Sequence, residues 1–385
     1  YLTRGEPVLL EIWKKVADEF MKENPGITVR IENVDYNGYW SKILTMITAG
    51  TPPDVIFLES NRMTGYIEKG ALTDLTPFLT KNKEFRIKDF FDVAIQPYMK
   101  DKHVYGLPND VAAIVMFYNK SLFDEAGLPY PKKGWTWDDL IKVSKKLTKD
   151  KNKDNVIDQY GLAYYDSDLA ISQNNGSMFN RVEKPTQCLL NTKAVKEAVK
   201  FCYDLSYTYK VAPKNSDFQD TDGRMMFIMG RVAMIPDGHW MVPKFKKEIT
   251  GFKWDVVVMP RKKKMAGSGR GSCLAIPAES KNKEAAFRFI KFATGFEGQK
   301  LLMQSDFSAP ALKSIAGSEY FLSPPPQNER AFIDMIKCAE LEPKLSNWDE
   351  VRDYINRELD KIWLDLEPMD KVLDETTRDV NKMLK

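Results

Sequence analysis

The feature that most constrains the fold is the alternation of helical and extended apolar patterns along the N-terminal part of the chain. A helical pattern over 8–20 ends at Asn24-Pro25-Gly26, a sequence typical of a helix end. Residues 27–31 then alternate as a strand does, 36–48 is helical again, and 55–58 is a short buried run. Strands separated by helices are joined by right-handed crossovers, so we expect an α/β fold with a mainly parallel sheet covered on both faces.

The alternation resumes in the middle of the chain. Thr136 and Asp139 have the Thr-x-x-Asp spacing of a capping box, so we expect a helix to begin there. Helical spacing also predicts a helix at 284–296 and a largely helical C-terminal part. Short apolar runs predict strands at 232–235, 256–259 and 273–276. With 385 residues, the chain is long enough for two domains or one large one.

Composition argues against several classes of function. Lys plus Arg number 57 and Asp plus Glu 54, so a net charge of +3 gives no electrostatic argument for nucleic acid or an anionic membrane. The longest apolar runs, such as 112–118, are far shorter than the ~20 residues that span a bilayer. His103 and His239 are too few for a histidine metal site or an obvious Ser-His-Asp triad.

The cysteines at 188, 202, 273 and 338 have neither metal-site spacing nor the density of a disulfide scaffold. This favours small buried thiols, with a single disulfide pair as the alternative.

Residues 260–272 form the one strongly basic, glycine-rich segment. Its glycines at 267, 269 and 271 have the spacing of a phosphate-binding loop, but such a loop precedes a helix, and here a strand is predicted to follow. We therefore expect an exposed connection between two strands, with a polyanion site as the lesser alternative.

A loop rich in Asp and Asn resembles the first part of an EF-hand. Oxygen side chains stand at its positions 1, 3, 5 and 9, but position 12 is Gly161, so the bidentate carboxylate is missing. A structural Ca²⁺ and a solvated turn both remain open. The ligands of such an ion would be Asp150, Asn152, Asp154, Val156 and Asp158.

Aromatic residues gather near predicted strand ends and loops. Aromatic faces beside Asn, Asp, Glu and Arg suit a sugar ring, because its C–H face packs on the π surface and its hydroxyls need planar polar partners. Core packing is the alternative for each of these residues. They are Tyr36, Tyr39, Trp40, Trp135, Trp137, Tyr164, Tyr165, Trp240 and Trp348.

A series of motifs covers nearly the whole chain in a specific order. In order and spacing they resemble the extracellular solute-binding proteins of ABC importers, in the large family that includes maltodextrin-binding protein. The motifs are Phe20-Met-Lys-Glu-Asn-Pro-Gly-Ile-Thr-Val29, Thr48-Ala-Gly-Thr-Pro-Pro-Asp-Val-Ile-Phe57, Gly70-Ala-Leu-Thr-Asp-Leu-Thr-Pro77, Tyr105-Gly-Leu-Pro108, Phe117-Tyr-Asn-Lys-Ser-Leu-Phe-Asp-Glu-Ala-Gly-Leu-Pro129, Trp135-Thr-Trp-Asp-Asp-Leu140, Gly230-Arg-Val-Ala-Met-Ile235 and Lys281-Asn-Lys-Glu-Ala-Ala-Phe-Arg-Phe-Ile290.

The resemblance implies a two-lobed periplasmic-binding-protein fold of type II, in which a ligand is held in the cleft between the lobes and a hinge closes on binding. Lobe one would comprise 1–110 and 275–310, and lobe two 111–274 and 311–385. The hinge segments would lie near 110–113, 271–275 and 308–311.

The resemblance also implies ligand-binding residues. Trp240 matches the place where relatives have a sugar-stacking tryptophan, and Trp348 a later stacking tryptophan. Asn61 and Arg62 stand where the maltodextrin binder has an Asp-Arg pair, so the charge of the first residue is lost here. The remaining candidates are Glu59 beside that pair, Asp110 at the first crossing with an alternative role as a hinge hydrogen-bonder, and the cleft-facing Tyr36, Trp40, Asn174, Asn175, Arg270 and Ser308.

The function implied is that of the binding component of an ABC sugar importer, which captures a neutral oligosaccharide and delivers it to the membrane permease. Such a protein is not an enzyme, requires no cofactor and acts as a monomer outside the cell, periplasmic or as a lipoprotein whose leader would precede this chain. The alternatives are the same fold binding glycerol phosphate or another anionic metabolite through Arg62 and Arg270, and a secreted glycosidase using two carboxylates.

Overall fold

The structure is a computed structural model that describes residues 1–4, 7–218 and 221–385. Within it the chain forms two compact units. Unit 1 comprises Tyr1–Ala112, Gly269–Ser323 and Lys344–Trp348, and unit 2 comprises Ala113–Ser268, Pro324–Pro343 and Asp349–Lys385. No helix in these described ranges is both long enough and apolar enough to cross a membrane.

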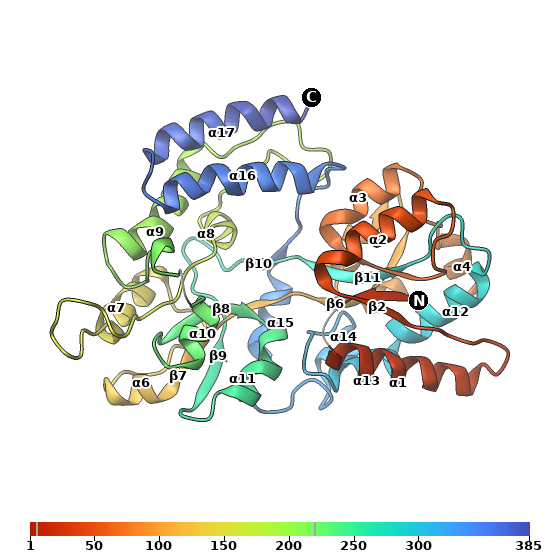
Figure 1. The fold of residues 1–385 in the computed structure, drawn as a ribbon, viewed down its shortest axis with the longest axis horizontal. Helices are drawn as coiled ribbons and strands as arrows, with labels where there is room; N and C mark the ends of the chain where they lie inside the picture. The colour runs from red at the N-terminus through yellow and green to blue at the C-terminus, as the bar shows by residue number, and fades with distance from the viewer. Residues whose placement is uncertain (5–6, 219–220) are drawn as a thin grey trace. The chain divides into compact units, whose positions relative to one another are not determined.

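Unit 1 is built on a five-stranded sheet in the order β2-β1-β3-β11-β6 (Figure 1). Its helices and strands are β1 (Leu2–Arg4), α1 (Pro7–Glu23), β2 (Glu32–Val34), α2 (Tyr36–Thr48), β3 (Ile56–Glu59), α3 (Ser60–Glu68), α4 (Thr76–Lys81), η1 (Ile87–Asp89), α5 (Asp92–Ile95), η2 (Gln96–Tyr98), β4 (Met99–Lys100), β5 (His103–Val104), β6 (Gly106–Val111), β11 (Gly271–Ala275), α12 (Lys283–Thr294), α13 (Phe296–Met303) and α14 (Lys313–Ala316).

Unit 2 contains a three-stranded sheet in the order β8-β7-β9 and a small pair of strands, β10 and β12. Its elements are β7 (Ile114–Asn119), α6 (Lys120–Glu125), α7 (Trp137–Leu147), α8 (Ser167–Gln173), α9 (Lys193–Tyr207), η3 (Asn215–Phe218), α10 (Gly223–Ile228), β8 (Met234–Gly238), η4 (His239–Met241), α11 (Val242–Glu248), β9 (Trp254–Val257), β10 (Gly267–Ser268), α15 (Arg330–Lys337), β12 (Ala339–Glu340), α16 (Trp348–Trp363) and α17 (Met369–Met383). Helix α16 begins at the last residue of the 344–348 segment of unit 1.

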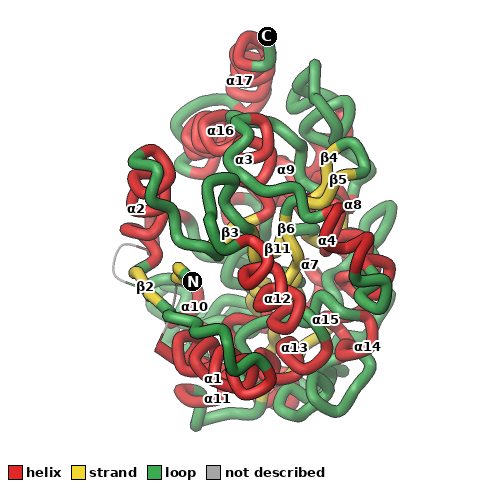
Figure 2. Tube along the Cα trace, turned by 90° about the vertical axis from the view of Figure 1, so that its right-hand side faces the viewer, coloured by secondary structure: helices red, strands yellow, loops and turns green. Residues whose placement is uncertain are grey.

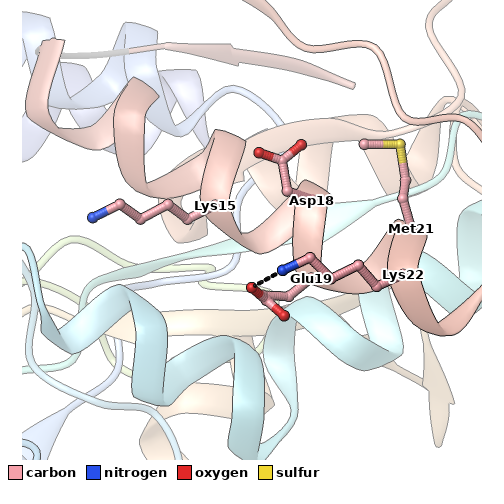
Figure 3. Close-up of a pocket in the computed structure, with 5 residues that line it drawn as sticks. All are labelled: Lys15, Asp18, Glu19, Met21 and Lys22. Carbon is pink, nitrogen blue, oxygen red and sulfur yellow. Dashed lines mark hydrogen bonds and ion pairs between the residues drawn. The ribbon is translucent and has the colours of Figure 1, made fainter.

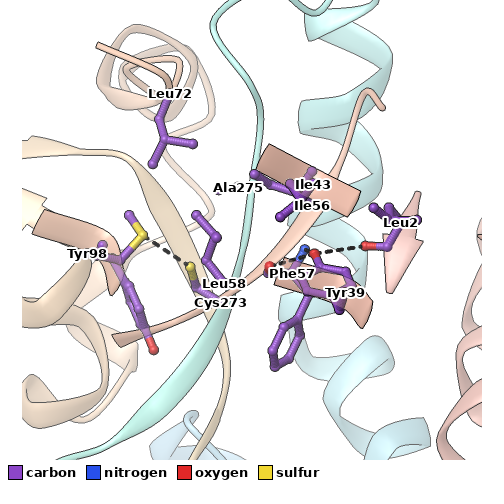
Figure 4. Close-up of a cluster of buried hydrophobic side chains, with 11 residues drawn as sticks. Leu2, Tyr39, Ile43, Ile56, Phe57, Leu58, Leu72, Tyr98, Cys273 and Ala275 are labelled. Atoms are coloured by element: carbon purple, nitrogen blue, oxygen red, sulfur yellow. Dashed lines mark hydrogen bonds between the residues drawn. The ribbon is translucent and has the colours of Figure 1, made fainter. Parts of the chain in front are cut away.

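The core of unit 1 lies between the sheet and its helices (Figure 4). Tyr39, on α2, is fully buried there, and its hydroxyl donates to the Phe57 carbonyl oxygen (2.7 Å) while it accepts from the Phe57 amide (3.0 Å). Phe20 on α1 packs edge-on against Phe289 of α12, with ring centroids 5.3 Å apart. These contacts fix α1, α2 and α12 on the sheet because each helix buries its apolar stripe there.

The core of unit 2 is aromatic. Phe117 on β7 lies 5.1 Å from Phe245 of α11 and 6.1 Å from Phe332 of α15, measured between ring centroids. Helices α16 and α17 lie side by side in both views (Figures 1 and 2), and the Tyr354 hydroxyl of α16 donates to the Asp379 carboxylate of α17 (3.1 Å). One sheet and its covering helices therefore form a separate core in each unit.

The sequence predicted most helices correctly. The predicted helix at 36–48 is α2, and the capping box is present, since the Thr136 hydroxyl accepts from the Asp139 amide and the Asp139 carboxylate accepts from the Thr136 amide. The predicted strand at 27–31 is wrong. The strand that pairs with β1 is β2 at 32–34, while 27–31 alternates half-buried and exposed residues without entering the sheet.

The sheets are less parallel than predicted. In unit 1, β1 pairs in parallel with β2 and β3, but β11 runs antiparallel to both of its neighbours, β3 and β6. In unit 2, β7 lies between β8 and β9 and is antiparallel to both. A single reversed strand in the middle of a sheet makes both of its pairings antiparallel, even though its neighbours run in the same direction.

The first predicted crossing, 110–113, contains a unit boundary, but the other two, 271–275 and 308–311, lie within unit 1. Residues 271–275 are β11, an interior strand of unit 1, and Ala309 within 308–311 pairs with Val111 in the same unit. The chain passes between units at 112–113 and 268–269, then at 323–324, 343–344 and 348–349. All four cysteines are free thiols, with Cys188 and Cys273 buried.

Candidate functional site

Trp240 lies in unit 2 directly after a buried strand. Strand β8 is buried along its whole length and pairs with β7, with Gly238 opposite Ile114. Trp240 follows in η4 and is half-buried. Its ring lies against Gly238, where an added Cβ would be only 2.1 Å from Trp240 Cζ3. A larger residue at 238 would therefore force the Trp240 ring to move.

An ion pair between the buried Asp237 and the partly exposed Arg224 holds this turn. Asp237 is 2% exposed, and its carboxylate accepts two bonds from the Arg224 guanidinium, from Nε at 2.6 Å and Nη2 at 3.1 Å. The same carboxylate accepts from the Gly238 amide (2.8 Å) and from the Trp240 side chain. Burial raises the pKa of the Asp237 carboxyl, while Arg224, Gly238 and Trp240 favour its ionised form. The Trp240 side chain is thus among the groups that favour the charged form of Asp237.

The other side of the turn is held by His239. Its Nε2 lies 3.1 Å from Glu329 Oε2, and both side chains are 3% exposed. The His239 ring packs edge-on against Phe332, with centroids 4.6 Å apart. Trp240 thus extends from a short turn that is anchored on both sides, so its partly exposed ring is oriented before any ligand arrives.

Unit 1 has a second aromatic and polar cluster, at the carboxyl end of β3. Arg62, in the first turn of α3, lies over Trp40 of α2 with its guanidinium carbon 4.1 Å from the ring centroid. The half-buried Asn61 is its neighbour, and Glu59 occupies the N-cap position of the same helix. A cation over an indole ring is a favourable contact that orients both groups. Glu59, Asn61 and Arg62 thus lie at the start of α3, with Trp40 of α2 under Arg62, and their role as ligand contacts stays a prediction.

Asp110 and Ser308 are brought together, but with protein partners. The Asp110 carboxylate accepts from the Ser272 amide (2.8 Å) and hydroxyl (2.7 Å) through Oδ1, and from the Ser308 hydroxyl (3.2 Å) through Oδ2. These contacts tie β6, β11 and the segment after α13 together. Asp110 thus makes hydrogen bonds within unit 1, and its expected roles as a ligand contact or a hinge hydrogen-bonder both stay predictions.

The remaining predicted residues are scattered. Asn174 is 1% exposed, and its amide donates to Ala194 O (2.8 Å) and Glu197 Oε2 (3.0 Å), which joins α8 to α9. Asn175 is exposed in the left-handed region (φ 57°), Arg270 is exposed, and Trp348 is buried at 2% exposure. The side chain of Tyr36 lies outside the described part of the structure.

The loop proposed for Ca²⁺ is a network of turns. The Asp150 carboxylate accepts from the Lys153 amide (2.7 Å) and the Asn155 amide (2.8 Å), and Asp158 accepts from the Lys151 amide (2.6 Å). Among the described residues, no group of three or more His, Cys, Asp or Glu side chains is placed to hold a metal ion. The Ca²⁺ site stays a prediction without a test.

A surface hollow of about 540 Å³ lies along α1 (Figure 3). It is lined by Lys15, Asp18, Glu19, Met21 and Lys22, and Lys22 pairs with Glu19 at 2.7 Å. Charged side chains of both signs surround it without an aromatic ring, so it lacks the flat apolar surface on which a sugar stacks.

Sequence analysis missed the groups that support Trp240. Arg224 and Asp237 stand on different elements, α10 and β8, and no motif connects them. The sequence signal that could have pointed to them is Asp237-Gly238 immediately before the tryptophan, where an acid and a glycine end an otherwise apolar strand.

Comparison with known proteins supplies the family. Residues 6–300 match the family described as bacterial extracellular solute-binding protein. A solved ABC substrate-binding protein from Listeria monocytogenes, in complex with cycloalternan, is 29% identical with a TM-score of 0.89, over 100% of this chain and 98% of that one. A putative binding protein of Brucella abortus is 24% identical over 97% of this chain and 90% of its own length. The maltooligosaccharide ABC transporter solute-binding lipoprotein of Streptococcus pneumoniae is 26% identical over 92% and 82%.

Proposed function

Since this chain belongs to the family of bacterial extracellular solute-binding proteins, we propose that it is the substrate-binding component of an ABC importer and that it captures a neutral oligosaccharide. The observation that carries the proposal is the half-buried Trp240 ring, which extends from a turn held by the buried Asp237 carboxylate and its ion pair with Arg224. A pre-oriented indole face binds the C–H face of a sugar without a large ordering cost.

The names of relatives support this ligand class. The Listeria protein was solved with cycloalternan, and the Streptococcus pneumoniae relative is named for maltooligosaccharide. In this chain, Asn61 and Glu59 offer an amide and a carboxylate for hydroxyl groups, and Trp40 is a further ring in the same unit. This mixture of planar polar groups and aromatic rings suits an uncharged ligand.

The protein acts as a receptor and leaves its ligand intact. The relatives are named as binding proteins, and the Asp110 carboxylate is engaged by Ser272 and Ser308. The partner that receives the ligand is the membrane permease, and the receptor works as a monomer outside the cell. Lipid anchoring, as in the Streptococcus pneumoniae lipoprotein, is part of the proposal.

The test is isothermal titration calorimetry of the purified chain against manno-, cello-, xylo- and maltooligosaccharides, with glycerol phosphate as the anionic control. We expect micromolar or tighter binding to one sugar series and no heat from the phosphate ester. The opposite pattern, with loss of phosphate binding in Arg62→Ala, would establish the anionic alternative. Cleavage of a bound oligosaccharide on prolonged incubation would instead establish a glycosidase.

A further inference from the structure

Helix α7 of unit 2 has lysines on the side that faces away from the core. Its buried residues repeat every three or four positions, and they are Trp137, Leu140, Ser144 and Leu147. Lys142, Lys145 and Lys146 have the same spacing on the opposite side of the helix, and all three are exposed. Because α7 lies at the edge of unit 2 (Figure 1), these lysines form a stripe that is open to solvent.

Two further cations lie beside the first turn of α7. The Trp137 amide donates to the carbonyl oxygen of Arg261 (3.1 Å), which joins the segment after β9 to the helix. The next residue is Lys262, whose ammonium lies 3.9 Å from Asp138 Oδ1. Both Arg261 and Lys262 are exposed, so they extend the stripe at its N-terminal end.

A sixth cation adjoins the other end of the helix. The Lys145 ammonium lies 4.6 Å from the centroid of the Tyr209 ring, which places the turn at 209–210 beside α7. Lys210 follows Tyr209 and is exposed. We call these cations together the cationic face, and they are Lys142, Lys145, Lys146, Lys210, Arg261 and Lys262.

Carboxylates offset only part of this charge. Asp138 and Asp139 lie in the first turn of α7, where Asp138 faces Lys262 and Asp139 accepts from the Thr136 amide (3.0 Å) and hydroxyl (2.7 Å). The negative charge of Asp139 also acts on Lys142 and Arg261. The loop after α7 adds no net charge, because its lysines at 149, 151 and 153 match its aspartates at 150, 154 and 158 in number. The cationic face therefore keeps a positive excess.

The lysines of α7 differ in their partners from the cations of α17 in the same unit. On α17, Lys371 pairs with Glu367 (2.8 Å), and Arg378 (3.3 Å) and Lys382 (2.7 Å) both pair with Asp379. Within the part of the chain that the structure describes, no ion pair involves the lysines at 142, 145 and 146. Like charges three and four residues apart on a helix repel one another, so an anionic partner would relieve that repulsion.

The chemistry of the cationic face suits a layer of anionic headgroups. A lysine ammonium is a point charge on a flexible stem, so it follows diffuse negative charge and lacks the fork with which arginine grips one phosphate. Its stem lies along apolar surface while the charge stays at the interface. The net charge of +3 is a sum over the whole chain and does not reveal this local excess. A receptor that serves a membrane permease works beside a bilayer, so the bilayer is the polyanion within its reach.

We propose that the cationic face docks unit 2 reversibly on the surface of an anionic lipid bilayer. The contact is electrostatic and leaves the helix on the surface of the membrane. The choice of a bilayer as the partner rests on the proposed function, and the docking itself goes beyond sugar capture. A receptor held at the membrane surface has a higher effective concentration near its permease than one that diffuses freely.

The experiment is co-sedimentation of the purified chain with vesicles of phosphatidylglycerol and phosphatidylcholine in equal parts, and with vesicles of phosphatidylcholine alone. The test variant combines Lys142→Gln, Lys145→Gln and Lys146→Gln, because glutamine removes the charge and keeps a good helix former. The matched control combines Lys371→Gln, Arg378→Gln and Lys382→Gln, which removes the same charge from exposed, paired positions of α17. Thermal melts establish that each variant is folded. Retention on immobilised polyphosphate and calorimetry with oligosaccharides are measured on the same proteins.

We expect the wild-type protein to bind the anionic vesicles and not the neutral ones, and to be released at about 1 M salt, where the Debye length falls to ~3 Å. The α7 variant should bind about 100-fold more weakly, because each lysine near an anionic surface contributes about fivefold, while the α17 variant keeps wild-type binding.

Three results would overturn the docking: no binding of the wild type to anionic vesicles, an equal loss in both variants, or retention on polyphosphate without vesicle binding. Sugar affinity should be the same in the wild type and both variants. A wild type that binds vesicles but none of the oligosaccharides would refute the proposed function instead, so the two failures are distinguishable.

Discussion

Replacing Gly238 by alanine tests the central geometric claim, that a larger residue at 238 forces the Trp240 ring to move. An added Cβ would lie 2.1 Å from Cζ3 and 2.2 Å from Cη2 of Trp240. Ordinary contact begins at 3.4 Å, so the ring must move by at least 1.3 Å (3.4 − 2.1). The backbone of Gly238 has φ −95° and ψ 173°, which alanine adopts without strain. The whole effect of the substitution is therefore steric.

The displaced ring loses both of its roles. It leaves the hydrogen bond to Asp237 and no longer presents its face in the anchored position. Loss of a well-packed aromatic contact costs roughly 1–3 kcal/mol of binding free energy, or about 5- to 150-fold in Kd. The free energy of unfolding should fall by about 1 kcal/mol, at the low end for an overpacked site, because a half-buried ring can swing outward.

The assay is calorimetry of Gly238→Ala with the oligosaccharide identified for the wild type, together with urea denaturation. The matched control is Gly251→Ala in the same unit, because an added Cβ there meets no atom within 4 Å. The control should keep the wild-type Kd. An unchanged Kd in Gly238→Ala would refute the reasoning, since the ring cannot stay where it is beside a new methyl group.

Further predictions concern the same turn, the helix cap and calcium. Trp240→Ala should weaken sugar binding by roughly 1–3 kcal/mol in calorimetry, and an equal Kd would remove Trp240 from the site. Arg224→Met should lower the free energy of unfolding by about 1–2 kcal/mol in urea denaturation, because the buried Asp237 loses its ionic partner but Arg224 is partly exposed and screened by water, whereas a loss below the error of the measurement would show that the pair is dispensable. Hydrogen bonds from Thr136 lower the pKa of Asp139 below its ordinary 3.8. Its ionised form therefore stabilises the fold above that pH and loses this effect as the pH falls through the lowered pKa. Asp139→Ala should cost about 1 kcal/mol at pH 7 and progressively less as the pH falls below 3.8, and a cost independent of pH would contradict the assignment. Sugar affinity should be the same in EDTA and in Ca²⁺, and a loss in EDTA would make calcium part of the site.

Local patterns predicted the elements whose signals are contained in a few neighbouring residues. The helix at 36–48 was predicted because its apolar stripe is periodic, and the helix start at Thr136 because a capping box needs only four residues. The strand at 27–31 failed because strand pairing is not local. Which residues join β1 depends on register, and β1 pairs with 32–34.

The candidate site shows the same limit. The resemblance proposed Trp240 as a ligand contact because it follows a predicted strand in a short motif. It could not identify Arg224, whose contact with Asp237 joins α10 to β8. Asn174 shows the opposite kind of failure. It was predicted to face a ligand, but its side chain is buried and donates hydrogen bonds to α9. Tertiary packing determines the surroundings of these side chains. The residues that take part in it are far apart in the sequence, so no local pattern reveals them.

Native mass spectrometry of the chain after incubation with the four oligosaccharide series and glycerol phosphate tests the central claim most directly. It reports what is bound, in what ratio, and whether the bound molecule is intact. We predict a monomer carrying an intact neutral oligosaccharide of one series, and no complex with glycerol phosphate. A chain that retains only the phosphate ester, or that releases shortened sugars, would contradict the account.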